Sequence, residues 1–201
     1  ALAKQWVAEG RPTPDVVIPI PDSARDAALS CAEELDLPYR EGFTKNRYIG
    51  RTFIMPNQEE RQKSIRRKLN PIKLEFKDKV VLLVDDSIVR GNTSRKIIEI
   101  VRASGAKAVY FASTSPPLVA PCPYGIDMAT KNDFVAINRS LDEVRDEIGA
   151  DELCYLDIQR MIDGGREGNN KITEFCTGCF TGCYPTPDAT EHLEDLSARS
   201  E

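Results

Sequence analysis

Residues 80–94 read VVLLVDDSIVRGNTS, and they indicate the fold more strongly than any other part of the sequence. The apolar run at 80–84 has no polar alternation, which predicts a central strand covered on both faces. Two acidic residues, Asp85 and Asp86, follow it at once. A short loop containing Gly91 then leads into an apolar-periodic segment, which predicts a helix over 92–104 that ends at a glycine.

The same alternation of strand and helix patterns continues through the chain and is typical of parallel strands joined by crossover helices. Residues 44–59 have no sustained period and predict a long loop. The fold class is therefore α/β, with a central, mostly parallel sheet flanked by helices over residues 1–165 and a C-terminal tail extension over 166–201. Further strands are expected at 16–20, 39–43, 108–114 and 153–157, and further helices at 24–35, 58–69, 141–148 and 158–164.

The composition is that of an ordinary soluble globular protein, with 41% apolar and 29% charged residues. No apolar run reaches membrane-spanning length and no charged-then-apolar leader is present, so we expect a cytoplasmic protein without membrane or nucleic-acid partners. The net charge of −5 conceals a basic block over residues 40–79. Such a block indicates either an anionic ligand or a solvated, ion-paired surface.

The order of strand, acidic pair and loop suits a phosphorylated ligand. Ligands of open α/β sheets bind beyond the carboxyl ends of the strands, where loop amides and a helix N-terminus attract phosphate. Gly91 would let the backbone approach closely, and the Thr93 and Ser94 hydroxyls could donate hydrogen bonds. Asp85 and Asp86 should point in opposite directions and divide between ribose hydroxyls and hydrated Mg²⁺, unless they merely cap the strand end.

Residues 80–94 resemble the signature of type I phosphoribosyltransferases that binds phosphoribosyl pyrophosphate (PRPP). The resemblance implies the type I phosphoribosyltransferase fold, with Asp85 and Asp86 at the ribose hydroxyls and the loop around the 5-phosphate. It also implies Mg²⁺ beside Ser23, Asp85 and Asp86. The residues assigned to PRPP in this way are Asp22, Ser23, Asp85, Asp86, Ser87, Val89, Arg90, Gly91, Asn92, Thr93 and Ser94.

Flanking segments narrow the resemblance to the amidophosphoribosyltransferase family, over nearly the whole chain and in the same order: PIPDSARDAAL, GFTKNRYIGRTFIMP, IRRKLNPIK, YGIDMA and EIGADEL. The resemblance implies an enzyme in which ammonia displaces pyrophosphate from PRPP, giving 5-phosphoribosylamine, the first step of de novo purine synthesis. Lys45, Tyr48 and Arg51 would be the catalytic residues, in a lid loop that excludes water. The family assembles as homotetramers, and purine nucleotides are possible inhibitors.

The family takes its ammonia from glutamine through an N-terminal glutaminase domain, and nothing in this sequence corresponds to that domain. We therefore expect this chain alone to use free ammonium and not glutamine. Two other functions remain open: a regulatory protein that senses PRPP without catalysis, and a salvage transferase that uses a purine or pyrimidine base.

The six cysteines lack a secretory context, which favours buried thiols and a metal or cluster site over disulfides. Some members of the family carry a [4Fe-4S] cluster, and Cys122, Cys176 and Cys179 match three of its ligands by position. The fourth would precede Ala1, unless Cys183 or Cys31 substitutes. Free thiols and zinc are the alternatives. Otherwise, Cys31 and Cys154 are expected to be core residues.

Overall fold

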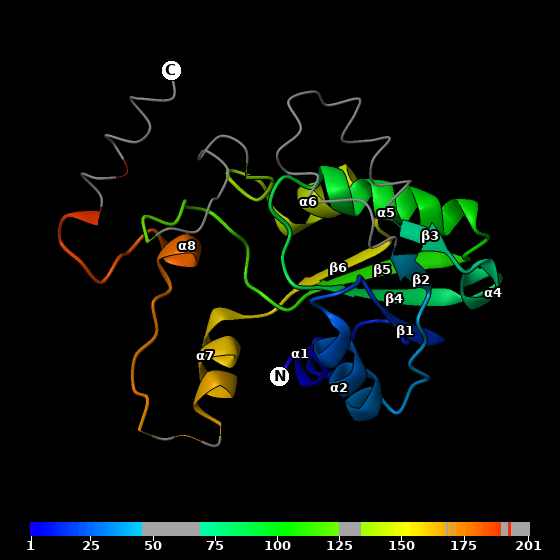
Figure 1. Ribbon diagram of the computed structural model, residues 1–201, viewed down its shortest axis with the longest axis horizontal. Helices are drawn as coiled ribbons and strands as arrows, with labels where there is room; N and C mark the ends of the chain where they lie inside the picture. Colours follow the sequence, from blue (N-terminus) through cyan, green and yellow to red (C-terminus); the bar gives the residue numbers. More distant parts are fainter. Residues whose placement is uncertain (46–68, 125–133, 168, 170, 190–192, 194–201) are drawn as a thin grey trace.

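The computed structural model describes residues 1–45, 69–124, 134–167, 169, 171–189 and 193. Within them, a sheet of four parallel strands has the order β1-β4-β5-β6, and a small antiparallel sheet pairs β2 with β3 (Figure 1). The strands are β1 (Val16–Pro19), β2 (Phe43–Lys45), β3 (Leu69–Pro71), β4 (Val80–Asp85), β5 (Ala108–Ser113) and β6 (Glu152–Tyr155). The helices are α1 (Leu2–Ala8), α2 (Arg25–Leu35), α4 (Lys73–Phe76), α5 (Asn92–Ala103), α6 (Leu141–Ile148), α7 (Ile158–Arg166) and α8 (Gly178–Thr181).

Each face of the four-stranded sheet carries its own hydrophobic cluster, with α5 and α6 on one face and α1 and α2 on the other (Figure 1). Successive side chains of β4 alternate between the two clusters, as Leu82 and Leu83 do, because strand side chains point to opposite faces in turn. Both leucines are 0% exposed. The prediction that residues 80–84 form a central strand covered on both faces is confirmed.

Helix α1 was not predicted from the sequence; it packs against α2 in one hydrophobic cluster and contacts the end of β6. Its Trp6 is 2% exposed and its indole N–H donates to the carbonyl of Pro12 (3.1 Å). The side-chain amide of Gln5 contacts two backbone groups at the end of β6. It donates to the Tyr155 carbonyl (3.0 Å) and accepts from the Asp157 N–H (2.8 Å). These contacts tie the start of the described chain to the last strand of the sheet.

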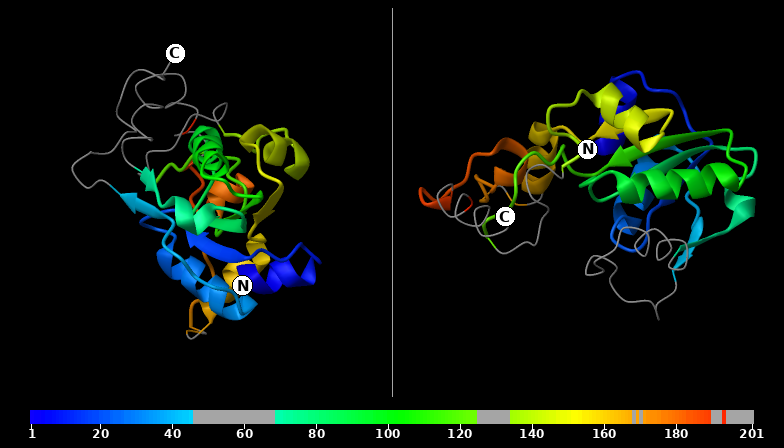
Figure 2. Two further views of the ribbon diagram at one scale, coloured as in Figure 1. Left: turned by 90° about the vertical axis from the view of Figure 1, so that its right-hand side faces the viewer. Right: turned by 90° about the horizontal axis from the view of Figure 1, so that it is seen from above.

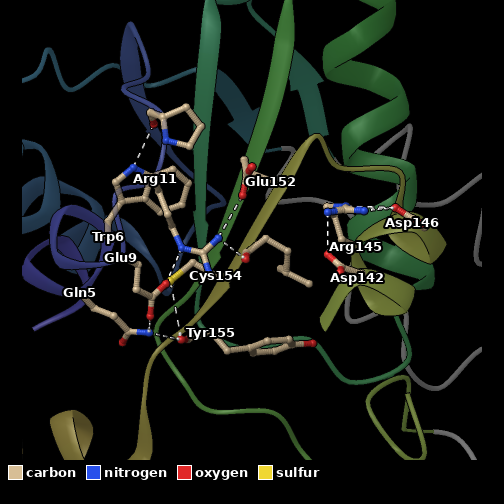
Figure 3. A network of polar contacts seen from close by, with 12 residues as sticks. Gln5, Trp6, Glu9, Arg11, Asp142, Arg145, Asp146, Glu152, Cys154 and Tyr155 are labelled. Atoms are coloured by element: carbon tan, nitrogen blue, oxygen red, sulfur yellow. Dashed lines mark hydrogen bonds and ion pairs between the residues drawn. The ribbon is translucent and has the colours of Figure 1, made fainter. Parts of the chain in front are cut away.

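Arg11, in the turn after α1, is the centre of a polar network at the amino end of β6 (Figure 3). Its guanidinium contacts the carboxylates of Glu9 (2.6 Å) and Glu152 (3.1 Å). It also donates to the Leu153 carbonyl (2.7 Å) and stacks 5.5 Å from the centre of the Trp6 ring. A planar, always charged group with several fixed donors suits such a junction, so this arginine joins three separate segments.

In the region of the small sheet, the structure contradicts the last residue of one predicted helix and most of one predicted strand. The helix predicted over 58–69 cannot include Leu69, which lies in β3 and pairs with Lys45; residues 58–68 are outside the described chain. The strand predicted at 39–43 is reduced to one bridge, between Tyr39 and Val17, and β2 begins only at Phe43. The physical reason is burial: Leu69 and Phe43 join the main cluster, a long-range contact that local periodicity does not reveal.

The C-terminal tail runs from α7 to α8 and extends away from the sheet on the side of its carboxyl ends (Figures 1 and 2). Among the described residues, no helix has both the length and the apolar character needed to cross a bilayer.

Candidate functional site

The carboxyl end of β4 presents a buried carboxyl group. Asp85 is the last residue of the strand, is 9% exposed, and accepts a hydrogen bond from the backbone N–H of Asp86 (2.9 Å). Burial raises the pKa of Asp85 to about 7, and the neighbouring negative charge of Asp86 adds to the rise. The amide hydrogen bond lowers the pKa again but does not cancel these two effects. Such a carboxyl would gain from a bound cation.

Asp86, in contrast to Asp85, is exposed to solvent. The hydroxyl of Ser87 donates to its carboxylate (3.2 Å). The acidic pair therefore offers one buried and one accessible carboxylate at the same strand end.

The loop after the acidic pair is held in place by contacts with the hydrophobic core and with Val135. Ile88 is 1% exposed in the core, and the Val89 carbonyl accepts a hydrogen bond from the N–H of Val135 (2.8 Å). Gly91 has φ +74°, and a Cβ atom there would lie 3.1 Å from Val135 and 3.3 Å from Ile148. Both the positive φ and the lack of space explain why this position is glycine.

Gly91 is the N-cap of α5 and supplies no side-chain cap. The first turn of α5 therefore keeps backbone N–H groups available for an anion. Thr93 and Asn92 are exposed there, whereas Ser94 is only 3% exposed. Arg95 donates to the side chain of Asn92 (2.9 Å) and pairs with Glu147 on α6 (3.2 Å), which holds this turn against its neighbour. Arg90 is exposed in the loop.

The loop after β1 reaches the same edge of the sheet because β1 is the neighbour of β4. The N–H of Ile20 donates to the Val84 carbonyl (2.8 Å), and the Pro21–Asp22 peptide that follows is cis. Asp22 and Ser23 are exposed in this turn. The two predicted ligand segments, distant in the sequence, therefore lie at the ends of adjacent parallel strands.

The predicted lid residues are largely beyond what the structure describes. The backbone of Lys45 ends β2, while Tyr48 and Arg51 lie outside the described residues, as do residues 125–133.

One residue at this edge was missed by sequence reasoning. Thr114, directly after β5, donates its N–H to the Asp85 carbonyl (2.9 Å) and its hydroxyl to the Asp86 carbonyl (3.3 Å). The signal that would have found it is the register of β4 and β5, which pairs Asp85 with Ser113.

The cysteine-containing tail docks on the loop after β5. The Cys179 carbonyl accepts hydrogen bonds from the N–H groups of Val119 (2.9 Å) and Ala120 (3.1 Å), and the Tyr184 hydroxyl donates to the Pro121 carbonyl (2.7 Å). Gly178 has no room for a side chain, since a Cβ atom would lie 2.3 Å from the Tyr184 ring. This docking brings the CxxC pair toward Cys122.

The thiols differ in their surroundings. Burial is the main cause that raises the pKa of Cys179, and Cys122 and Cys176 are near enough to raise it further. Among the described residues, however, no three Cys, His, Asp or Glu side chains are grouped to hold a metal ion. Cys31 and Cys154 are 4% and 0% exposed in the core, which confirms the prediction for them. Burial raises the pKa of Cys31 to about 11.

Comparisons with known proteins agree with this geometry. Residues 1–115 match the family model of the phosphoribosyl transferase domain. The chain is 52% identical to an amidophosphoribosyltransferase of Pasteurella multocida over 184 residues, which are 91% of this chain and 36% of that protein. It is 53% identical to an amidophosphoribosyltransferase of Escherichia coli over 182 residues, again 90% of this chain and 36% of that protein.

A solved structure of the glutamine PRPP amidotransferase of Bacillus subtilis, complexed with ADP and GMP, is similar with a TM-score of 0.78 and 44% identity. The similarity covers 92% of this chain and 41% of that one. The chain thus spans somewhat more than a third of the length of the relatives it matches.

Proposed function

Because this chain belongs to the phosphoribosyl transferase domain family, which its first 115 residues match, we propose that it binds PRPP with Mg²⁺ and transfers the phosphoribosyl group to ammonia. The observation that carries the proposal is the pair Asp85 and Asp86 at the carboxyl end of β4, followed by a glycine-capped entry into α5. The names of the relatives at about half identity support ammonia as the acceptor.

In this proposal the ribose and the metal lie over the acidic pair. Mg²⁺ prefers carboxylate and water oxygens, and a buried carboxyl whose pKa is raised to about 7 fits a site that becomes favourable when a divalent cation neutralises it. The exposed Asp86 would accept hydrogen bonds from ribose hydroxyls. The 5-phosphate would accept hydrogen bonds from the backbone N–H groups of residues 87–94, including those at the N-terminus of α5, and the side chains of the loop would surround it.

Pyrophosphate would occupy the turn at Asp22 and Ser23, with Ser23 beside Mg²⁺. In the transfer, the bond from C1 of the ribose to the pyrophosphate oxygen breaks and a bond from C1 to the ammonia nitrogen forms, which then loses a proton to solvent. Ammonia is already a nucleophile, so the residues contribute positioning and charge stabilisation and no strong base. Lys45, Tyr48 and Arg51 are proposed to close over the substrate.

The wider assignments belong to the same proposal. Residues 1–165 would form the transferase domain and 166–201 a tail, in a cytoplasmic homotetramer that purine nucleotides inhibit. Ammonia would come from glutamine through a glutaminase domain outside this chain, in the first step of purine synthesis. The similar Bacillus subtilis structure, which is complexed with ADP and GMP, supports nucleotide binding as a part of this proposal.

A [4Fe-4S] cluster at Cys122, Cys176 and Cys179 is the least supported part, since no group of three such side chains among the described residues is arranged for a metal. Its support is the docking of the CxxC segment beside the loop that contains Cys122. Iron and acid-labile sulfide should be measured in anaerobically purified protein, and their absence would remove the cluster.

The proposed function is tested by calorimetric titration with PRPP and Mg²⁺, followed by assays of pyrophosphate release with ammonium and then with free bases. We expect Mg²⁺-dependent binding and release that depends on ammonium. Binding without release would instead identify a PRPP sensor, and release only with a purine or pyrimidine base would identify a salvage transferase. A protein that binds no PRPP in the presence of Mg²⁺ would refute all three.

A further inference from the structure

The side-chain hydroxyl of Thr114 lies against the backbone of the acidic pair, and no role has been given to it above. We propose that Thr114 is a positioning residue that fixes the peptide between Asp86 and Ser87, where the phosphate-binding loop begins, and thereby sets the affinity for PRPP. This inference rests on the proposed function, which it deepens by adding a residue from a third strand.

Three hydrogen bonds together fix the peptide planes of the acidic pair. The N–H of Thr114 binds the Asp85 carbonyl (2.9 Å), and the N–H of Asp86 binds the Asp85 side chain (2.9 Å). The Thr114 hydroxyl completes the set by donating to the Asp86 carbonyl (3.3 Å). The first bond uses backbone atoms and continues the β4–β5 ladder, so the hydroxyl contact is the part that depends on the residue type.

Thr114 is itself held in place by the residues on either side. Ser113 is 0% exposed, and its hydroxyl donates to the Ser115 carbonyl (2.9 Å) and accepts from the Ser115 N–H (3.2 Å). Such a serine turn restricts the backbone locally. A rigid turn on β5 therefore supports the hydroxyl that contacts the strand end of β4.

The Asp86 carbonyl belongs to the peptide that opens the loop of residues 87–91. Loss of the hydroxyl contact would let that peptide rotate, and the Ser87 N–H, the first amide of the loop, would turn with it. A single neutral hydrogen bond of this kind corresponds to a ~3- to 10-fold change in an equilibrium constant. The effect should appear in ligand affinity, because the ladder bond from the Thr114 N–H still holds the strand end.

The test uses two complementary variants of Thr114. Thr114→Val keeps the β-branched shape and removes the hydroxyl, whereas Thr114→Ser keeps the hydroxyl and removes the methyl group. PRPP affinity is measured by calorimetry at several Mg²⁺ concentrations, with thermal unfolding of the unliganded proteins. Thr181→Val is the matched control, since the Thr181 hydroxyl also donates to a carbonyl, that of Thr177 (3.0 Å), far away in α8.

We expect Thr114→Val to weaken PRPP binding ~3- to 10-fold with nearly unchanged unfolding, and Thr114→Ser and Thr181→Val to bind like the wild type. Wild-type affinity in Thr114→Val, or weak binding in Thr114→Ser instead, would overturn the positioning role and leave the proposed function intact. A wild-type protein that does not bind PRPP would overturn both.

Discussion

The charged side chains of Arg11 and Asp85, at opposite ends of the central sheet, have opposite electrostatic surroundings. At the amino end of β6, the side chain of Arg11 is 14% exposed and has two carboxylates, a carbonyl and an aromatic ring around it (Figure 3). At the carboxyl end of β4, Asp85 is 9% exposed, and its pKa is raised by burial and by the like charge of Asp86.

From this difference we infer that the Arg11 end of the sheet contributes to stability and the Asp85 end to ligand binding. A buried charge with partners on both α1 and β6 joins those elements, and removing it should destabilise the protein. A buried carboxyl beside another carboxyl opposes folding. We expect such a group where a bound ligand or cation compensates its negative charge, as at the carboxyl ends of parallel strands. Four substitutions, taken from the largest expected effect to the smallest, test this assignment of stability and binding.

The largest effect is expected for Asp85→Asn, which should weaken PRPP and Mg²⁺ binding by about 100-fold or more, since it removes a charged contact to the metal or the ribose. The variant should also be more stable than the wild type above pH 7, by up to about 4 kcal/mol. The pKa of about 7 in the folded protein lies above the usual aspartate value of 3.8, so the stabilising effect of protonation is complete below about pH 4 and is lost as the pH rises through 7.

Calorimetry at pH 8 and urea unfolding at several pH values between 4 and 8 measure the two effects. The matched control is Asp15→Asn, because the Asp15 carboxylate accepts the Val80 N–H (2.7 Å) at the opposite end of β4 and should not affect PRPP affinity. If the Asp85→Asn protein were less stable at pH 8 than the wild type, the contrast between the two ends would be wrong.

Arg11→Met should have the next largest effect and lower the free energy of unfolding by roughly 2–3 kcal/mol, because Glu9 and Glu152 lose their arginine partner and the Leu153 carbonyl loses a hydrogen-bond donor. PRPP affinity of the folded protein should not change. Urea unfolding measures the loss, and Lys4→Met is the control. Lys4 and Glu34 are 64% and 48% exposed and 3.9 Å apart, so that pair should contribute less than about 0.5 kcal/mol. Equal losses in the two variants would contradict the role of the Arg11 network.

Gly91→Ala should destabilise the protein by about 1–3 kcal/mol and weaken PRPP binding, through strain at positive φ and contact with Val135. Gly149→Ala separates the two causes: Gly149 has φ +76° but no atom within 4 Å of its added Cβ. It should lose only about 1 kcal/mol and keep its affinity. Unfolding and calorimetry of both variants give the difference, and identical behaviour would mean that crowding beneath the loop is unimportant.

The smallest effect is expected at the start of α6. Ser140 caps this helix by accepting the Glu143 N–H (3.2 Å), and the Glu143 carboxylate accepts the Ser140 N–H (2.7 Å). Ser140→Ala should cost about 1 kcal/mol without any change in PRPP binding, as measured by thermal unfolding. Glu143→Gln, which preserves the reciprocal pattern, serves as the control and should cost less.

Local patterns predicted most of the sheet and the helices around it. The continuous apolar run of β4 and the moderate periodicity of α5 and α6 are signals that lie within each segment, so they were read correctly to within a few residues. The failures include Leu69, the strand predicted at 39–43, and the unpredicted α1, α4 and α8. Two of them depend on distant partners, since Leu69 pairs with Lys45 and Trp6 of α1 is buried against residues of other segments.

The sequence by itself determined that two carboxylates and a glycine-capped helix N-terminus follow a buried strand, because those features are adjacent in the chain. Only the tertiary structure decided that Asp85 is buried, that Asp22 and Ser23 lie at the neighbouring strand end, and that Thr114 contacts the acidic pair. The physical reason is register: parallel strands bring together residues that are tens of positions apart, and no local spacing encodes which ones will meet.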